Sequence, residues 1–596
     1  MERSFPDCGG KPSGERTRFI RGAAGWLSYR PYDLSLERFL PDDVMTNVPD
    51  IDLDFPRSIR EELILRTHEK WGWERAVLTG TIATYKIRGV VRDLGKALGL
   101  PQVEVDRLAK QTHWGSAKKL ESEMQKIPGF KNKIELPSWR DLVRLALELD
   151  GFPKYMGQHP GGMVISSSPL TDIVPVQRAA IEGRYVCQWD KDSIDDAGFV
   201  KIDFLALGTL SQLQEAVGII KERTGERIDM SRIDFEDTAV YDMLCEGDTI
   251  GIFQVESSAQ MQTIIRLRPR NLLDMAHEVG AVRPGVGVNN GVQEYLARRS
   301  GRKPVTYDHP LEKRALERTL GVVLFQDQVN QLAIDVAGFA PSEADRLRRA
   351  FGRKHNTELI EQFHRKFLEG AGTEVASEEA VETVFKKFNG QYMFPESHAF
   401  AFGVTAYQSA WLKLYYPLEF FVAIFNQQPM GFYNMETLKE DAKRHGVRVL
   451  NPDINLSRTK CVIESRSVIP VRRGGQGIQR RGGLAPGSLP DDAREIEGNS
   501  SSSTCGGLSQ NDIPGGNGKA RKGIACCGSI RLGVIHVDGL GKASTEAIEK
   551  AQEGGPFRDI GDFLERTGVL EEVALNLASA GAFDSRIQRI FNLAPL

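Results

Sequence analysis

The amino-acid sequence predicts a multidomain α/β protein. With 596 residues, the chain is too long for one hydrophobic core, so several domains are expected. Residues 49–55 and 198–207 alternate apolar and polar side chains, which is typical of β-strands. Residues 83–150 and 209–450 are mostly helical in pattern, with charged residues beside apolar stripes. These patterns indicate strand-rich blocks interleaved with larger helical domains.

Composition narrows the class of protein. The chain is 41% hydrophobic and 26% charged, and its net charge of -3 gives no global argument for nucleic-acid binding. The seven cysteines are scattered and none forms a Cys-x-x-Cys pair, which fits a reducing cytoplasm and argues against a zinc site or a disulfide scaffold. The sequence has no signal-peptide pattern and no apolar run of membrane-spanning length. We therefore expect a cytoplasmic protein with no membrane association.

Two segments differ from the rest. Residues 1–18 are polar and rich in Gly, Pro and Arg, and we expect them to be disordered. Residues 465–528 are rich in Gly, Ser and Arg and have almost no apolar periodicity. They are interpreted as a flexible insertion or as sequence that is not native to the fold. Ordered patterning returns at residue 530 and continues to about residue 585.

The strand at residues 49–55 carries the first candidate site. Alternate side chains share one face of a β-strand, so three carboxylates are expected on one side: Asp50, Asp52 and Asp54. Three carboxylates on one face repel each other and lose solvation if they are buried. Two Mg²⁺ ions would neutralise them, because hard divalent cations prefer oxygen ligands and a two-metal site needs bridging carboxylates.

Two alternatives compete with this metal site. The strand could be an edge strand whose acidic face is exposed to solvent, and the local sequence leaves this alternative open. A calcium-binding loop beginning at Asp50 would place Glu61 at position 12. Position 6 of such a loop must turn sharply and is usually Gly, but here it is Phe55, so the calcium loop is disfavoured.

A further carboxylate lies in a similar setting. Between Phe199 and Phe204, apolar residues alternate with Lys201 and Asp203, so those two side chains share the polar face of a strand. Taken alone, they could form a structural ion pair. Paired with the strand at residues 49–55, Asp203 would complete a metal site of three carboxylates.

On these residues the sequence resembles the bacterial family C DNA polymerases, which include the alpha subunit of DNA polymerase III and its error-prone relatives. The resemblance spans about residues 35–460 and 530–585. Beyond the two acidic strands it rests on further blocks in the family's order: Gln158–Ile165, Gln188–Asp195, Gly251–Ser257, Val282–Gly285, Gly321–Val329, Gly338–Phe351 and Ser397–Pro417. The residues of two short segments, Phe394–His398 and Gln428–Tyr433, favour the error-prone, translesion branch.

The resemblance implies a nucleotidyltransferase-type, polymerase beta-like palm with a mainly helical thumb and fingers and a C-terminal helix–hairpin–helix element. The implied domains follow one another along the chain: a disordered start (1–18), the first part of the palm (19–82), the thumb (83–157), the second part of the palm (158–208), the fingers (209–456), a disrupted or low-complexity insertion (457–529) and the helix–hairpin–helix region (530–596).

The resemblance also implies a reaction and its partners. The family's metal-binding, catalytic aspartates fall on Asp50, Asp52 and Asp203, and Asp54 is kept as a weaker candidate. They would hold two Mg²⁺ ions, with Mn²⁺ as the alternative ion. The implied reaction is attack of a primer 3′-hydroxyl on the α-phosphate of a dNTP, with release of pyrophosphate. The expected partners are primer–template DNA and dNTPs, and a sliding clamp and other translesion proteins are further candidates.

Five residues match family positions around the incoming nucleotide. Lys201, Arg348 and Arg349 would hold the triphosphate, since the planar arginine fork can give two hydrogen bonds to phosphate oxygens. Arg38 is a further candidate near the active site, and His398 occupies the place where the family rejects ribonucleotides. Without the family, the two fingers arginines would more often lie on a solvated helix face, and His398 would more often be a satisfied core histidine.

Near the C-terminus, Gly539 and Gly541 precede Lys542 and an amphipathic helix. A Gly-x-Gly turn before a helix lets backbone N–H groups approach a phosphate. In the family this region is a helix–hairpin–helix element that holds duplex DNA without reading its sequence. The resemblance therefore assigns DNA binding to these three residues.

The sequence also departs from the family. Family members begin with a metal-binding phosphoesterase domain, for which this sequence has no room. The Gly-Ser motif of the palm should precede Arg38, but only Gly22–Gly25 is found there, without the serine. The segment 465–528 is a third departure. A truncated or frame-disrupted gene product would explain these features together, so a replicative alpha-subunit fragment and an inactive remnant that only binds DNA are the alternative functions.

Overall fold

The computed structural model describes residues 51–465 and 528–584, apart from residues 114, 200, 284–286, 289, 353–356, 372–376, 389–393 and 432. The chain divides into two compact units: Met1–Glu236 with Val240–Leu438, and Asp237–Ala239 with Lys439–Leu596. Two predicted site residues, Asp50 and Arg38, lie outside the described residues, as does the segment 1–18. No helix in the described part of the chain is both long enough and apolar enough for a membrane span.

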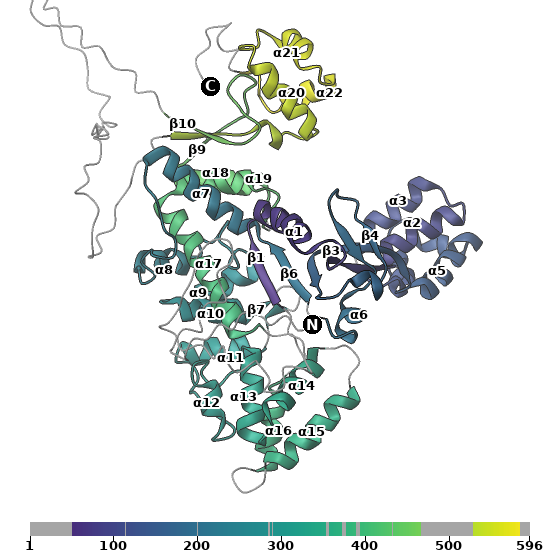
Figure 1. Cartoon of the computed structure of the whole chain (residues 1–596), viewed down its shortest axis with the longest axis vertical. Coiled ribbons are helices and arrows are strands. Elements are labelled where there is room, and N and C mark those ends of the chain that lie inside the picture. The colour runs from purple at the N-terminus through teal and green to yellow at the C-terminus, as the bar shows by residue number, and fades with distance from the viewer. Residues whose placement is uncertain are drawn as a thin grey trace, which may run out of the picture. The chain divides into compact units, whose positions relative to one another are not determined.

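A six-stranded mixed sheet forms the centre of the first unit, with strand order β1-β6-β3-β2-β5-β4. Its strands are β1 (Ile51–Phe55), β2 (Ala76–Thr84), β3 (Pro153–Ile165), β4 (Val176–Arg178), β5 (Tyr185–Cys187) and β6 (Lys201–Ala206). Strands β1 and β6 run parallel and side by side (Figure 1), and β3 pairs antiparallel with both β6 and β2. Helix α1 (Arg57–Trp71) follows β1, and helix α7 (Gly208–Thr224) follows β6.

Strand alternation decides which side chains of the sheet are buried. On one face, Leu53 and Phe55 of β1 and Phe204 of β6 pack with Met163 of β3 and Ile64 of α1. The rings of Phe55 and Phe204 meet edge to face, with their centroids 5.8 Å apart. Because successive side chains of a strand point to opposite faces, the aspartates of β1 and β6 are left on the other face.

A helical subdomain is inserted between β2 and β3. It consists of α2 (Ile87–Ala97), α3 (Gln102–Gln111), α4 (Leu120–Lys126) and α5 (Pro137–Leu149), with short 3-10 helices at Ala117–Lys119 and Lys131–Glu135. Its core includes Val90, Leu108 and Trp139. The two strands that flank the insertion continue as one antiparallel ribbon, which leads from this subdomain into the sheet.

The largest helical region follows α7. Its elements are α8 (Thr238–Cys245), α9 (Ser258–Leu267), α10 (Leu272–Ala281), β7 (Val282–Arg283), β8 (Gly287–Val288), α11 (Asn290–Arg299), α12 (Glu312–Leu316), α13 (Gln326–Ala337), α14 (Pro341–Gly352), α15 (Thr357–Ala371), α16 (Glu378–Lys386), α17 (Glu396–Tyr415) and α18 (Pro417–Asn426). Helix α17 crosses α10 closely: a Cβ on Gly403 would lie 3.0 Å from the backbone nitrogen of Ala276. One core surrounds this crossing, and a second core joins α13 to α16.

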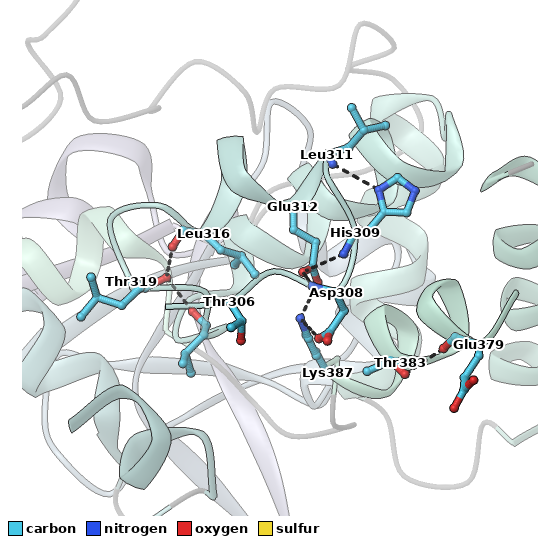
Figure 2. Close-up of polar contacts among 12 residues, drawn as sticks. Thr306, Asp308, His309, Leu311, Glu312, Leu316, Thr319, Glu379, Thr383 and Lys387 are labelled. Atoms are coloured by element: carbon cyan, nitrogen blue, oxygen red, sulfur yellow. Dashed lines mark hydrogen bonds and ion pairs between the residues drawn. The ribbon is translucent and has the colours of Figure 1, made fainter. Parts of the chain in front are cut away.

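An ion network ties the loop before α12 to the end of α16 (Figure 2). Lys387 Nζ lies 2.6 Å from both Asp308 Oδ2 and Glu312 Oε1. The fully buried Glu312 also accepts the backbone N–H of Asp308 through Oε2, at 2.8 Å. Because Lys387 pairs with two acids in and just before α12, the network holds α12 against the end of α16.

The second unit combines a small sheet with helices. The sheet has the order β10-β11-β9 and consists of β9 (Arg448–Leu450), β10 (Val462–Ser465) and β11 (Gly528–Arg531). Its helices are most of α19 (Met435–Arg444), α20 (Lys542–Gln552), α21 (Ile560–Thr567) and α22 (Glu571–Ser579). Ser465, at the end of β10, pairs with Gly528, at the start of β11. The predicted insertion 465–528 lies almost entirely outside the described residues.

Candidate active site

The two acidic strands are neighbours, and their aspartates are in register. Asp52 of β1 is the partner of Asp203 of β6 in the parallel pairing. Neighbouring strands lie about 4.8 Å apart, and paired residues of parallel strands point to the same face. Asp52 is exposed and Asp203 is buried. The structure therefore brings together two of the three aspartates that the sequence predicts as metal ligands.

Asp203 has one occupied and one free oxygen. The ammonium of Lys201, which is itself buried, donates to Asp203 Oδ2 at 2.7 Å. Asp203 Oδ1 is buried and has no hydrogen-bond partner among the described residues. A buried carboxylate normally has its acceptor positions filled, so the open position needs a further positive or hydrogen-bonding group.

Asp54 lies on the same face as Asp52. Burial and, to a lesser extent, the nearby negative charge of Asp52 together raise the pKa of Asp54 to about 6. Its Oδ1 atom is buried and lacks a hydrogen-bond partner in the described part of the chain. The weaker candidate of the sequence analysis thus belongs to the same acidic cluster as Asp52.

The donor set of this cluster fits a hard divalent cation. All its available atoms are carboxylate oxygens, which Mg²⁺ and Mn²⁺ prefer. Two buried oxygens, Asp54 Oδ1 and Asp203 Oδ1, have open acceptor positions. A divalent ion would also relieve the repulsion between Asp52 and Asp54 that raises the pKa of the latter.

His159 is a member of the site that sequence reasoning did not single out. Its Nδ1 atom lies 3.8 Å from Asp203 Oδ1. Burial lowers the pKa of His159; the charge of Asp203 opposes this shift, and the charges of Lys201 and Lys191 add to it. The only signal in the sequence was the block Gln158–Ile165, in which the histidine precedes two glycines.

The second of these glycines explains how His159 and Asp203 come so close. A Cβ on Gly162 would lie 2.6 Å from Thr79 Oγ1, 2.7 Å from His159 Nδ1 and 2.9 Å from Asp203 Oδ1. No side chain fits where three polar atoms converge on one α-carbon. Glycine is therefore required at this position for the site to keep its shape.

Arg348 and His398, which the family places around the incoming nucleotide, lie in one cluster of contacts. Arg348 donates to Asp345 Oδ1 at 2.6 and 3.0 Å and to Gln326 Oε1 at 2.9 Å. The backbone N–H of Gln326 donates to Phe394 O at 3.1 Å. The ring of His398 stacks on Phe394 with centroids 5.4 Å apart. The cluster thus links α13, α14 and the start of α17.

The surroundings of these two side chains differ from a solvated helix face. The side chain of Arg348 is 26% exposed and is held by protein acceptors. The ring of His398 contacts the rings of Phe394 and Phe402, and burial lowers its pKa. Such packing is also that of a satisfied core histidine, the alternative that the sequence left open. Arg349 belongs to α14, but its side chain lies outside the described residues.

In the second unit, the predicted DNA-binding turn precedes α20. Gly539 has a φ of +82°, and a Cβ there would lie 2.7 Å from Asn576 Nδ2. That amide group donates to Asp538 O at 2.9 Å and ties the turn to α22. Gly541 is the N-cap of α20, and the side chain of Lys542 is almost fully exposed. The turn therefore places the ammonium of Lys542, which pairs with Glu546 Oε1 at 3.7 Å, at the surface.

Comparisons with known proteins agree with this arrangement. Residues 27–206 match the bacterial DNA polymerase III alpha NTPase domain, residues 209–374 match the bacterial DNA polymerase III alpha subunit finger domain, and residues 512–589 match a helix–hairpin–helix motif. Proteins named error-prone DNA polymerase are similar along most of the chain. That of Bordetella bronchiseptica is 37% identical over 92% of the chain and 46% of its own length. That of Methylococcus capsulatus is 36% identical over 92% and 49%, and that of Pseudomonas fluorescens is 41% identical over 78% and 45%. The chain thus spans about half the length of the curated relatives it matches.

Proposed function

We propose that this chain, which belongs to the bacterial DNA polymerase III alpha subunit family and is closest to its error-prone branch, carries the core of a DNA-directed DNA polymerase that acts in translesion synthesis. Three matched family models and relatives that bear the name error-prone DNA polymerase support the proposal. The observation that carries it is the in-register pair Asp52–Asp203, with Lys201 bound to one oxygen of Asp203 and the other oxygen open.

In this proposal, Asp52 and Asp203 hold the catalytic cations together with Asp50, and Asp54 is an additional oxygen donor. Two Mg²⁺ ions, or Mn²⁺, would supply a lowered pKa for the primer 3′-hydroxyl and charge stabilisation for the leaving pyrophosphate. The protein's own contribution is positional. Lys201 fixes the orientation of Asp203, and the buried face of β1 and β6 keeps the carboxylates at a constant spacing.

Roles can also be proposed for the parts of the chain around these carboxylates. We assign the six-stranded sheet to a palm of the nucleotidyltransferase type, the helical insertion 83–157 to the thumb and residues 209–456 to the fingers. Lys201, Arg348, Arg349 and Arg38 would hold the triphosphate, and His398 would screen the sugar. The packing of His398 against two phenylalanine rings supports a rigid screen, because a closely packed ring has little room to move.

The second unit would hold duplex DNA. Gly539, Gly541 and Lys542 are suited to phosphate contacts, which supply affinity without sequence preference. Primer–template DNA and dNTPs are the proposed partners, with a sliding clamp and other translesion proteins as further candidates. We expect the protein to work in the cytoplasm.

Primer extension tests the proposal. The full chain is given a primer–template, dNTPs and Mg²⁺, and Asp52→Asn is compared with Asp141→Asn, a half-exposed aspartate of α5 that serves as the matched control. We expect extension by the wild type and the control, and a loss of at least about 1,000-fold in Asp52→Asn. Absence of extension by the wild type, together with equal DNA binding by all three proteins, would instead support a remnant that only binds DNA.

A further inference from the structure

The imidazole of His159 has one nitrogen fixed by the backbone. Its Nδ1 atom accepts the N–H of Gly162 at 2.5 Å and the N–H of Gly161 at 3.3 Å. A nitrogen that accepts hydrogen bonds from N–H groups carries no proton. The ring proton is therefore on Nε2, and the backbone determines which tautomer is present.

The Nε2–H group is a donor that the fold leaves available. Nε2 has no hydrogen-bond partner in the part of the chain that the structure describes, and the side chain is 24% exposed. On its other edge the ring reaches Asp203, with 3.8 Å between Nδ1 and Asp203 Oδ1. The donor is thus held at the border of the acidic cluster rather than inside the core.

The turn that holds the ring is fixed on three sides. A Cβ on Gly161 would lie 2.2 Å from the carbonyl oxygen of Phe204, so this turn is pressed against β6. Gly162 allows the close approach of His159, Asp203 and Thr79 described above. Arg60 of α1 donates to Pro160 O at 2.7 Å. The backbone turn that donates to Nδ1 is therefore held against β6 and α1, which limits the positions open to the ring.

We propose that His159 is a substrate-binding residue whose Nε2–H donates to a phosphate oxygen of the substrate held at Asp203. Two sources of that oxygen exist in the proposed reaction: the triphosphate of the incoming nucleotide and the 3′-terminal phosphodiester of the primer. Both are anionic acceptors, and a neutral ring N–H next to the buried Lys201 suits either. This inference rests on the proposed function and adds a contact to it.

Asparagine is the informative substitution at this position. Its side-chain oxygen can accept backbone N–H groups two and three residues later, so His159→Asn keeps the turn and removes Nε2–H. His159→Gln reaches further and can return an N–H donor near the lost one. Gln158→Ala is the matched control, because alternation places that side chain on the opposite face of β3. Thermal unfolding of each full-chain variant checks that the fold is kept.

Primer extension and equilibrium binding give the result. We expect His159→Asn to unfold at the wild-type temperature and to lose about ten- to hundredfold in kcat/KM, with partial recovery in His159→Gln. A raised KM for the dNTP or a lowered kcat assigns the contact to the incoming nucleotide. Weaker binding of primer–template, measured by fluorescence anisotropy, assigns it to the primer. Values for His159→Asn within twofold of wild type in all three quantities would overturn the inference.

Failure of the proposed function would give a different experimental result from failure of the His159 contact. If the wild type does not extend primers, the affinities for dNTP and for primer–template are measured without turnover. Weaker binding of either ligand by His159→Asn then still supports the contact, and equal binding of both overturns it. A wild-type chain that binds neither ligand overturns the contact and the proposed function together.

Discussion

Lys201 and Asp203 form a buried ion pair on one strand, with Nζ and Oδ2 separated by 2.7 Å. The pair uses one oxygen of Asp203 and leaves the other open toward the face that also carries Asp52. A single carboxylate is thereby anchored on one side and available on the other. Such an arrangement keeps a metal ligand in position before any ion binds, which is the condition for preorganised electrostatic catalysis.

Removal of Lys201 should destabilise the fold. Lys201→Met would leave Asp203 buried without its cation, and we expect the free energy of unfolding of the first unit to fall by about 3 to 5 kcal/mol. Denaturant unfolding measures this loss. The double variant Lys201→Met with Asp203→Leu should recover part of it, because no buried charge then remains. A double variant whose loss equals the sum of the two single losses would contradict the coupling.

A methyl group on Gly162 should disturb the site more than the fold. Its Cβ would meet Thr79 Oγ1, His159 Nδ1 and Asp203 Oδ1 at 2.6 to 2.9 Å, and all three are side-chain atoms that can move. We expect Gly162→Ala to lose most primer extension. Gly218→Ala is the control: no atom lies within 4 Å of the added Cβ in α7, and the change should raise stability by about 0.5 to 1 kcal/mol. Wild-type activity in Gly162→Ala would show that the tight convergence is not needed.

The structural features behind these two predictions differ in how well they can be predicted from the sequence alone. Strands β1 and β6 could be predicted because each alternates charged and apolar residues, and alternation is a local property. Strand β2 was missed, since Ala76–Thr84 has no clean alternation and precedes a helical stretch. The contact of His159 with Asp203 could not be predicted, because it depends on the register of β3 against β6 and on a turn with two glycines. Arg348 contacts Gln326 of another helix, α13, and this long-range contact also lay beyond any local pattern.

Stability should depend on pH through Glu278. This residue of α10 is fully buried, neither of its carboxyl oxygens has a partner among the described residues, and burial raises its pKa well above the ordinary value. The folded protein then holds the proton more tightly than the unfolded chain, so stability present at low pH is lost as the pH rises above about 4.5. The variant Glu278→Gln lacks this titration. Its stability relative to wild type should increase by up to about 1.4 kcal/mol per pH unit in that range.

Denaturant unfolding of both proteins between pH 5 and 8 gives the comparison, in roughly half-unit steps. A raised pKa of Glu278 in the folded protein requires a difference that grows with pH. A constant difference across the range would mean that Glu278 keeps an ordinary pKa in the folded protein.

Selection against ribonucleotides should depend on His398. Its ring packs against Phe394 and Phe402, so truncation opens space at a fixed place instead of loosening a mobile side chain. We expect His398→Ala to lower the ratio of dNTP to rNTP incorporation by about tenfold or more. The exposed His113, replaced by Ala, is the matched control. An unchanged ratio of dNTP to rNTP incorporation in His398→Ala would mean that this residue serves only in packing.

We propose above that the carboxylates of β1 and β6 jointly bind a divalent cation. Electron paramagnetic resonance of added Mn²⁺ measures this most directly, because free and protein-bound ions differ in signal. The wild-type chain is titrated beside Asp203→Asn and the control Asp141→Asn. We expect Mn²⁺ binding by the wild type and the control, and a fall in affinity of at least about tenfold in Asp203→Asn. Equal Mn²⁺ affinity in all three proteins would contradict the account.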